Sequence, residues 1–179
     1  MRPIFLIGFM GSGKSTLGRA LSRATGMQFI DLDLYIECRF HASVRDIFAS
    51  QGEDAFRDIE RRMLKEVCDF EDVIVACGGG TPCFFDNIDI MNRSGITVML
   101  DASRPRLLQR LKLGRRKRPL IAAMTDEQLE QYISEALEIR MPYYSKASVT
   151  FMADRLDSAD QINESVACIS EILRLPATQ

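Results

Sequence analysis

Apolar runs alternate with segments of helical periodicity along the whole chain. Five short apolar runs bounded by turn-forming residues predict buried strands. They cover residues 4–7, 27–30, 72–77, 97–100 and 148–152. Between them, apolar residues recur at three- and four-residue spacing, which is typical of amphipathic helices. Strands that alternate with helices predict one α/β layer structure with a mainly parallel sheet.

The helical patterns carry start and stop signals. They cover residues 17–25, 34–38, 43–48, 53–70, 84–94, 103–113, 125–142 and 158–175. Ser43 and Thr125 are residue types that cap helix N-termini, and Gly26 is a typical helix stop. Phe56 and Ile59 belong to an apolar stripe, which predicts the buried face of the longer middle helix.

The first strand runs into the segment Gly8–Thr16, GFMGSGKST. This segment fits the phosphate-binding P-loop pattern G-x-x-x-x-G-K-[ST]. Its glycines let successive backbone N–H groups face an anion, and the following helix N-terminus adds partial positive charge. We expect Lys14 to reach the β- and γ-phosphates of a nucleotide and the Ser15 hydroxyl to bind Mg²⁺. A glycine-rich turn without a ligand would need neither side chain.

Two aspartates, Asp31 and Asp33, follow the second strand. In open α/β sheets, ligands bind outside the carboxyl ends of the strands. Residues two apart share a face in extended chain, so one aspartate could help to hold Mg²⁺ and the other could meet a substrate hydroxyl. Taken alone, Asp33 is equally well explained as the cap of the helix at residues 34–38.

Further polar and glycine positions have two interpretations each. Gly78–Gly80 follow the third strand and would let backbone N–H groups approach a ligand closely, although a flexible turn is the alternative. Arg57 and Glu60 are three residues apart on one helix, and spacing alone predicts an ordinary surface ion pair. Arg140, near the end of its helix, is explained by favourable placement against the helix dipole.

Four consecutive cations, Arg115–Arg118, lie between Gly114 and Pro119 and do not belong in a core. They could form a solvated loop, a nucleic-acid patch or a mobile lid. Four basic residues are weak support for nucleic-acid binding in an acidic protein. A lid is favoured because a kinase must exclude water from the phosphate that it transfers.

The composition predicts a soluble globular protein. The 179 residues suit one domain, and 46% hydrophobic and 27% charged residues are ordinary values. The net charge of −2 does not point to nucleic acid. No signal peptide or membrane-spanning segment is predicted, so we expect a cytoplasmic protein. The five cysteines are odd in number and lack C-x-x-C spacing, which argues against structural disulfides and zinc.

In combination, these motifs resemble those of the shikimate kinases. The set consists of the P-loop, Asp31-Leu32-Asp33, Phe56-Arg57-x-x-Glu60, Ala76-x-Gly78-Gly79-Gly80, Arg118-Pro119-Leu120 and Arg140-x-Pro142-x-Tyr144. The resemblance extends from Ile4 to about Leu173. It implies the three-layer P-loop kinase fold of the nucleoside-monophosphate-kinase type, with a five-stranded parallel sheet in the order 2-3-1-4-5 and a mobile lid.

The resemblance also implies an activity and its location in the chain. The activity is ATP-dependent phosphorylation of the 3-hydroxyl of shikimate, on the way to chorismate and the aromatic amino acids. Residues 1–179 would form a single kinase domain, with a substrate-binding insertion at about 33–61 and the lid at about 112–124. Shikimate and ATP would be the partners and Mg²⁺ the cofactor, with no nucleic acid or membrane, in a monomer.

Roles for single residues follow from the same resemblance. The implied catalytic residues are Lys14, Asp33 and Arg118. The nucleotide would contact Gly11, Ser12, Gly13, Lys14, Ser15, Thr16, Arg110 and Arg118. Shikimate would contact Asp33, Arg57, Gly79, Gly80 and Arg140, and Mg²⁺ would be held by Ser15 and Asp31. The chemistry agrees, because arginine forks suit a carboxylate and an aspartate suits a hydroxyl.

Some features of the chain depart from the family pattern, and three alternative functions differ in how well they fit the motifs. Pro82-Cys83 follows the glycines, the lid is unusually basic, and residues 153–157 fit the adenine loop only loosely. A gluconate or nucleoside-monophosphate kinase of this fold is the nearest alternative, although F-R-x-x-E before A-x-GGG favours shikimate. A GTPase switch would need an N-K-x-D motif, which the chain lacks. A degenerate binding protein would not keep every expected polar residue.

Overall fold

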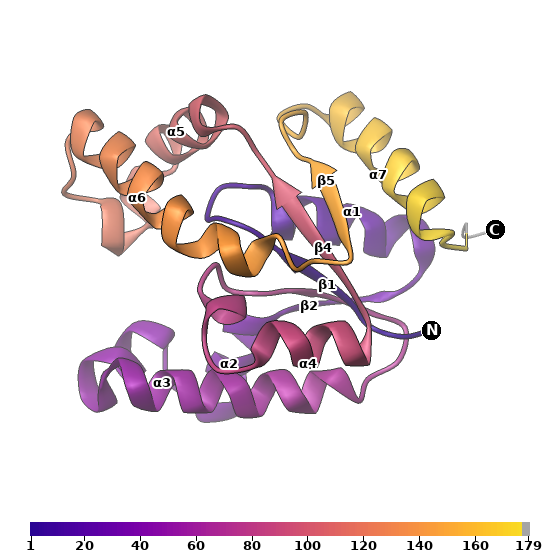
Figure 1. Ribbon diagram of the computed structural model, residues 1–179, viewed down its shortest axis with the longest axis horizontal. Helices are drawn as coiled ribbons and strands as arrows, with labels where there is room; N and C mark the ends of the chain where they lie inside the picture. The colour runs from indigo at the N-terminus through magenta and orange to yellow at the C-terminus, as the bar shows by residue number, and fades with distance from the viewer. Residues whose placement is uncertain (177–179) are drawn as a thin grey trace.

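A five-stranded parallel sheet forms the centre of the computed structural model, which describes residues 1–176 (Figure 1). The strands are β1 (Ile4–Ile7), β2 (Gln28–Asp31), β3 (Val73–Ala76), β4 (Ile96–Asp101) and β5 (Val149–Met152). They lie in the order β2-β3-β1-β4-β5, and every pairing is parallel. The predicted fold class and strand order are therefore confirmed. The last three residues of the expected 1–179 domain lie outside the described residues.

The helices between the strands follow the predicted pattern closely. They are α1 (Lys14–Thr25), α2 (Leu32–Phe40), α3 (Val44–Cys68), α4 (Asn87–Ser94), α5 (Arg104–Leu113), α6 (Asp126–Tyr144) and α7 (Ala159–Leu173). Short 3₁₀ turns lie at Thr81–Cys83, Arg115–Lys117 and Pro119–Ile121. Across residues 1–176, every helix is too short or too polar to cross a lipid bilayer.

The two helical layers follow from the strand order. The chain passes from β1 to β2 in one direction along the sheet, and later crossovers run in the opposite direction. Because parallel crossovers are right-handed, α1 must lie on the face opposite to α3 and α4. Figure 1 shows this arrangement, with α7 packed beside α1 after the chain leaves β5. The central strands β1 and β3 are buried along their whole length, as expected for a sheet covered on both faces.

The register of the sheet brings three loops to one edge. Leu6 on β1 and Asp31 on β2 both pair with Ala76 on β3. The P-loop follows β1, the two aspartates lie at the end of β2, and Gly78–Gly80 follow β3. Three segments that are separate in the sequence therefore emerge side by side at the carboxyl ends of the strands, where ligands bind in this fold class.

Several helix boundaries differ from the sequence prediction, for example at α4, which begins at Asn87 and not at residue 84. The two helices predicted at 43–48 and 53–70 are joined in α3, with a kink at Gly52, whose φ is 82° and ψ is 175°. The predicted Ser43 cap is confirmed, because its hydroxyl accepts a hydrogen bond from the Asp46 N–H. α2 begins one residue earlier than Asp33, which lies in the first turn, so Asp33 is not the helix cap. α6 continues past Pro142 to Tyr144.

Candidate active site

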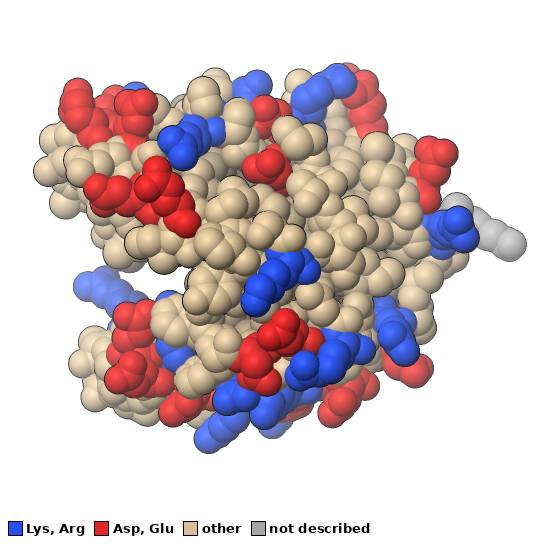
Figure 2. Space-filling view, in the orientation of Figure 1, with Lys and Arg blue, Asp and Glu red and all other residues tan. Residues whose placement is uncertain are grey.

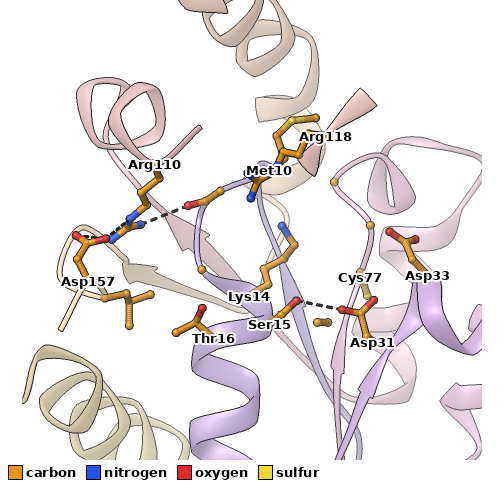
Figure 3. Close-up of a pocket in the computed structure, with 16 residues that line it drawn as sticks. Met10, Lys14, Ser15, Thr16, Asp31, Asp33, Cys77, Arg110, Arg118 and Asp157 are labelled. Atoms are coloured by element: carbon orange, nitrogen blue, oxygen red, sulfur yellow. Dashed lines mark hydrogen bonds and ion pairs between the residues drawn. The ribbon is translucent and has the colours of Figure 1, made fainter. Parts of the chain in front are cut away.

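A cavity of about 490 Å³ lies at the carboxyl edge of the sheet (Figure 3). Most of the residues predicted as site residues line it together, namely Gly11, Gly13, Lys14, Ser15, Thr16, Asp31, Asp33, Gly79, Arg110 and Arg118. Ser12, Arg57, Gly80 and Arg140 are not part of that lining. Its remaining wall is formed by Met10, Ala76, Cys77, Gly78, Leu156 and Asp157. None of these six was among the predicted site residues, although Gly78 belongs to the predicted glycine loop and Leu156 and Asp157 to the segment compared with the adenine loop.

The P-loop holds its lysine in place through backbone carbonyls. The Lys14 ammonium donates hydrogen bonds to the carbonyls of Gly8 at 2.8 Å and Phe9 at 2.9 Å. Desolvation lowers the pKa of Lys14 to about 8, against the opposing effect of neighbouring acidic groups that include Asp33 and Asp31. α1 begins at Lys14, so the positive end of the helix dipole also faces this position. The loop thus presents positive charge to an anion.

Two oxygen ligands suited to a hard cation lie beside the P-loop. The Ser15 hydroxyl donates a hydrogen bond of 3.1 Å to the Asp31 carboxylate, and both side chains line the cavity (Figure 3). Mg²⁺ is usually bound through one or two carboxylates together with substrate phosphates and water. A hydroxyl and a carboxylate at the mouth of a phosphate-binding loop fit that requirement.

Asp33 is a half-buried carboxylate to which no described side chain or backbone group donates a hydrogen bond. Desolvation raises the pKa of Asp33 from its ordinary 3.8 to about 6, and the negative charges of Glu60 and Asp31 add to the effect. An ionised oxygen with unused acceptor capacity can receive a hydrogen bond from a ligand hydroxyl. The structure therefore favours a functional interpretation of Asp33.

The three glycines after β3 allow two arginines to approach the backbone closely. A Cβ atom on Gly79 would lie 3.1 Å from Arg140 Nη1, and one on Gly80 would lie 3.0 Å from Arg57 Nη2. Larger residues would push these guanidinium groups away. Arg57 belongs to α3 and Arg140 to α6, and the molecule is hollowed between these helices (Figure 2). The glycine loop therefore brings both arginines to one end of the cavity.

Arg57 is held by aromatic rings and carboxylates. Its Nη1 donates to the Glu60 carboxylate at 2.9 Å, and the ring centroid of Phe84 lies 3.9 Å from its guanidinium carbon. Glu60 is only 1% exposed and also accepts a hydrogen bond from Thr81. The alternative of an ordinary surface ion pair is therefore wrong. A buried carboxylate fixed at both oxygens orients the arginine instead.

Two residues for which the sequence predicted no individual role, Phe9 and Tyr144, position Arg140. Its guanidinium carbon lies 5.3 Å from the ring centroid of Phe9 in the P-loop. Tyr144, one helical turn further along α6, is fully buried and donates a 2.6 Å hydrogen bond to the Gly79 carbonyl. The spacing of Arg140 and Tyr144 in the motif R-x-P-x-Y was the available signal, since residues four apart share a helix face.

Arg110 and Arg118 approach the cavity from its other sides (Figure 3). Arg110 donates to the Ala153 carbonyl at 2.9 Å, to the Asp154 carbonyl at 3.0 Å and to the Asp157 carboxylate at 2.7 Å. It thus fastens the loop after β5 next to the P-loop. Arg118 donates one hydrogen bond, to the Gly114 carbonyl at 3.1 Å.

Comparison with known proteins gives a consistent result. The family model for shikimate kinase matches residues 10–170. A shikimate kinase of Phocaeicola vulgatus is 53% identical over 166 residues, which cover 93% of this chain and 95% of the relative. The 1.7 Å crystal structure of shikimate kinase from Bacteroides thetaiotaomicron has a TM-score of 0.94 at 46% identity, covering 97% of this chain and 99% of that chain.

A second solved structure is that of shikimate kinase from Acinetobacter baumannii in complex with shikimate. It has a TM-score of 0.83 at 30% identity and covers 97% of this chain and 94% of that chain. These matches span the P-loop, the aspartates, the glycine loop and both arginines. The resemblance stated from the motifs is confirmed, and the chain belongs to the shikimate kinase family of ATP-dependent kinases.

Proposed function

We propose that this protein transfers the γ-phosphoryl group of ATP to the 3-hydroxyl of shikimate, giving shikimate 3-phosphate and ADP for chorismate and aromatic amino-acid synthesis. The observation that carries the proposal is that Lys14 and the unpartnered Asp33 line one cavity. Gly79 also lines this cavity, and a Cβ atom on it would lie 3.1 Å from Arg140 Nη1. A site suited to phosphate therefore adjoins a site suited to a ligand that carries a carboxylate and a hydroxyl group.

The donor half is the P-loop and its surroundings. The backbone of Gly11, Ser12 and Gly13 would cradle the phosphates, with Lys14 on the β- and γ-phosphates and Thr16 beside them. Ser15 and Asp31 would hold Mg²⁺, which neutralises phosphate charge when bound. Arg110 would border the adenine side, because it fastens the loop at residues 153–157 to the P-loop.

The acceptor half recognises one carboxylate and a reacting hydroxyl. Arg57 and Arg140 would bind the carboxylate through guanidinium N–H groups, and the Gly79 and Gly80 backbone would lie against the ring. Asp33 would accept a hydrogen bond from the 3-hydroxyl and orient it for in-line attack. Its unused acceptor capacity supports this role. Above about pH 6 its ionised form is also available to receive the proton.

Arg118 would join the two halves when the lid, at about residues 112–124, closes over bound ligands. Its guanidinium already lines the cavity and has a single described hydrogen bond, so it can turn toward phosphate with little loss. A positive charge there would stabilise the transferring phosphoryl group. Closure would also exclude water, which would otherwise hydrolyse ATP. We expect the enzyme to act as a monomer in the cytoplasm.

An ADP-release assay with alternative acceptors tests the proposal. We expect shikimate to accelerate ADP release strongly over the rate with ATP and Mg²⁺ alone. Gluconate shares a carboxylate and hydroxyls but is an open chain, and nucleoside monophosphates lack the carboxylate, so both are expected to give little acceleration. A rate with shikimate no higher than that without an acceptor would refute the proposed function.

A further inference from the structure

Arg57 already binds a second carboxylate besides that of Glu60. Its Nε and Nη2 atoms both donate to one oxygen of Glu53, at 3.2 and 3.0 Å. Glu60 accepts a hydrogen bond from Nη1, and the Phe84 ring covers one face of the guanidinium group. A Cβ atom on Gly80 would lie 3.0 Å from Nη2 and 3.1 Å from Nη1. Three of the five N–H groups of Arg57 therefore already donate to protein carboxylates, and Glu53 occupies the side-on pair on Nε and Nη2. A ligand carboxylate can take this side-on pair only after Glu53 leaves.

The two carboxylate partners differ in how firmly they are held. Glu60 is 1% exposed and is tied to Thr81 as well as to Arg57. The side chain of Glu53 is 56% exposed, and within residues 1–176 its only hydrogen-bond and ion-pair partner is Arg57. Releasing Glu53 therefore returns a carboxylate to water, whereas releasing Glu60 would leave a buried charge unpaired. Glu53 is the partner that can be displaced.

The backbone beside Glu53 leaves its side chain room to move. Gly52 interrupts α3 with a φ of 82° and a ψ of 175°, and, apart from the glycine and its two chain neighbours, no described residue has an atom within 4 Å of the position where its Cβ would be. Glu53 thus stands at the start of the second, straight part of α3. A displaced carboxylate at this place still interacts favourably with the N-terminal end of that part.

We propose that Glu53 is an internal competitor for the acceptor site: its carboxylate occupies the side-on donors of Arg57, and an acceptor carboxylate binds by displacing it. This inference rests on the proposed function, because it assumes an acceptor that carries a carboxylate. The exchange replaces one ion pair by another. Glu53 thereby lowers the affinity for an acceptor with a carboxylate and leaves the affinity for an uncharged ligand unchanged, since an uncharged ligand does not take its place on Arg57.

Calorimetric titration of shikimate into the full-length protein tests the inference. Glu53→Gln keeps the shape of the side chain and removes its charge, and Asp54→Asn is the matched control because Asp54 is an exposed neighbour with no described partner. An exposed ion pair has a small interaction free energy, so we expect the Kd for shikimate to fall by about two- to fivefold in Glu53→Gln. In Asp54→Asn the Kd is expected to stay at the wild-type value. Glu53→Ala is expected to show the same gain as Glu53→Gln and serves as the second variant.

A neutral ligand provides the second readout. The methyl ester of shikimate has no carboxylate to replace Glu53, so its Kd is expected to be equally high in wild type and Glu53→Gln. In kinetics, Glu53→Gln is expected to lower the KM for shikimate while kcat and the KM for ATP are unchanged. A role in orienting Arg57 would instead raise the KM for shikimate.

Three results would overturn the inference: an unchanged or weaker affinity for shikimate in Glu53→Gln, an equal gain in Asp54→Asn, or an equal gain for the methyl ester. Failure of the proposed function looks different, since wild type itself would then not bind shikimate. The two failures are thus distinguished by the wild-type titration alone.

Discussion

Replacement of Asp33 by asparagine is expected to stabilise the protein while it abolishes phosphoryl transfer. The ionised Asp33 carboxylate is half-buried and partly desolvated, receives no hydrogen bond within residues 1–176, and lies near the negative charges of Glu60 and Asp31. Its ionisation therefore opposes folding. Asparagine has nearly the same shape without the charge, so Asp33→Asn removes this cost together with the ionised oxygen that would receive the proton of the substrate hydroxyl.

The size of the effect follows from the pKa. Folding raises the pKa of Asp33 from 3.8 to about 6. Each unit corresponds to about 1.4 kcal/mol, so the ionised group costs on the order of 3 kcal/mol. Between these two values the native state binds more protons than the unfolded state, so this group lowers the free energy of unfolding as pH rises. The difference between Asp33→Asn and wild type is therefore near zero at about pH 4 and grows to at most about 3 kcal/mol above about pH 6.

Urea unfolding of the ligand-free protein in EDTA, from about pH 4 to about pH 8, measures this difference. EDTA removes divalent cations that would otherwise bind near Asp31. Asp58→Asn, at an exposed position on α3, controls for the loss of one negative charge. A stability difference for Asp33→Asn that does not change with pH, or that favours wild type at about pH 8, would refute the reasoning.

Other substitutions test the remaining parts of the site. Arg57→Ala and Arg140→Ala are each expected to raise the KM for shikimate roughly tenfold or more, because a hydrogen bond to a charged group contributes about 1.5–3 kcal/mol, while the KM for ATP changes little. Equal rises in both KM values would count against the arginine pair. Lys14→Ala is expected to abolish transfer without a lower thermal unfolding midpoint, and retained activity would contradict the P-loop mechanism. Gly79→Ala would place a Cβ 3.1 Å from Arg140 Nη1 and is expected to raise the KM for shikimate severalfold. An unchanged KM would show that Arg140 tolerates the displacement.

Much of the donor site was predictable because it is local. Gly8–Thr16 is one continuous segment, and a strand, a glycine loop and a helix in that order form a phosphate site with few contributions from elsewhere. The alternating periodicity likewise predicted all five strands, since buried parallel strands are short apolar runs. The strand order followed from the family resemblance, because periodicity does not specify which strands are neighbours.

The acceptor side depended much more on the tertiary structure. Spacing alone made Arg57 and Glu60 an exposed ion pair, and only the packing of α3 against the glycine loop buries Glu60 and places Phe84 over the arginine. Glu53 shows the same limit. Its i, i+4 spacing to Arg57 was visible, but spacing does not reveal that Glu60 and Phe84 leave Glu53 as the displaceable partner.

The sequence by itself therefore determined the fold class, the phosphate loop and the residue types of the acceptor site. The tertiary structure decided their state: the raised pKa of Asp33, the occupied donors of Arg57 and the hydrogen bond from Tyr144 to Gly79. The physical reason is that backbone geometry and periodicity are local properties of the chain. Desolvation and competition for hydrogen bonds instead depend on groups brought together from distant positions, and their balance is set only when the helices pack against the carboxyl edge of the sheet.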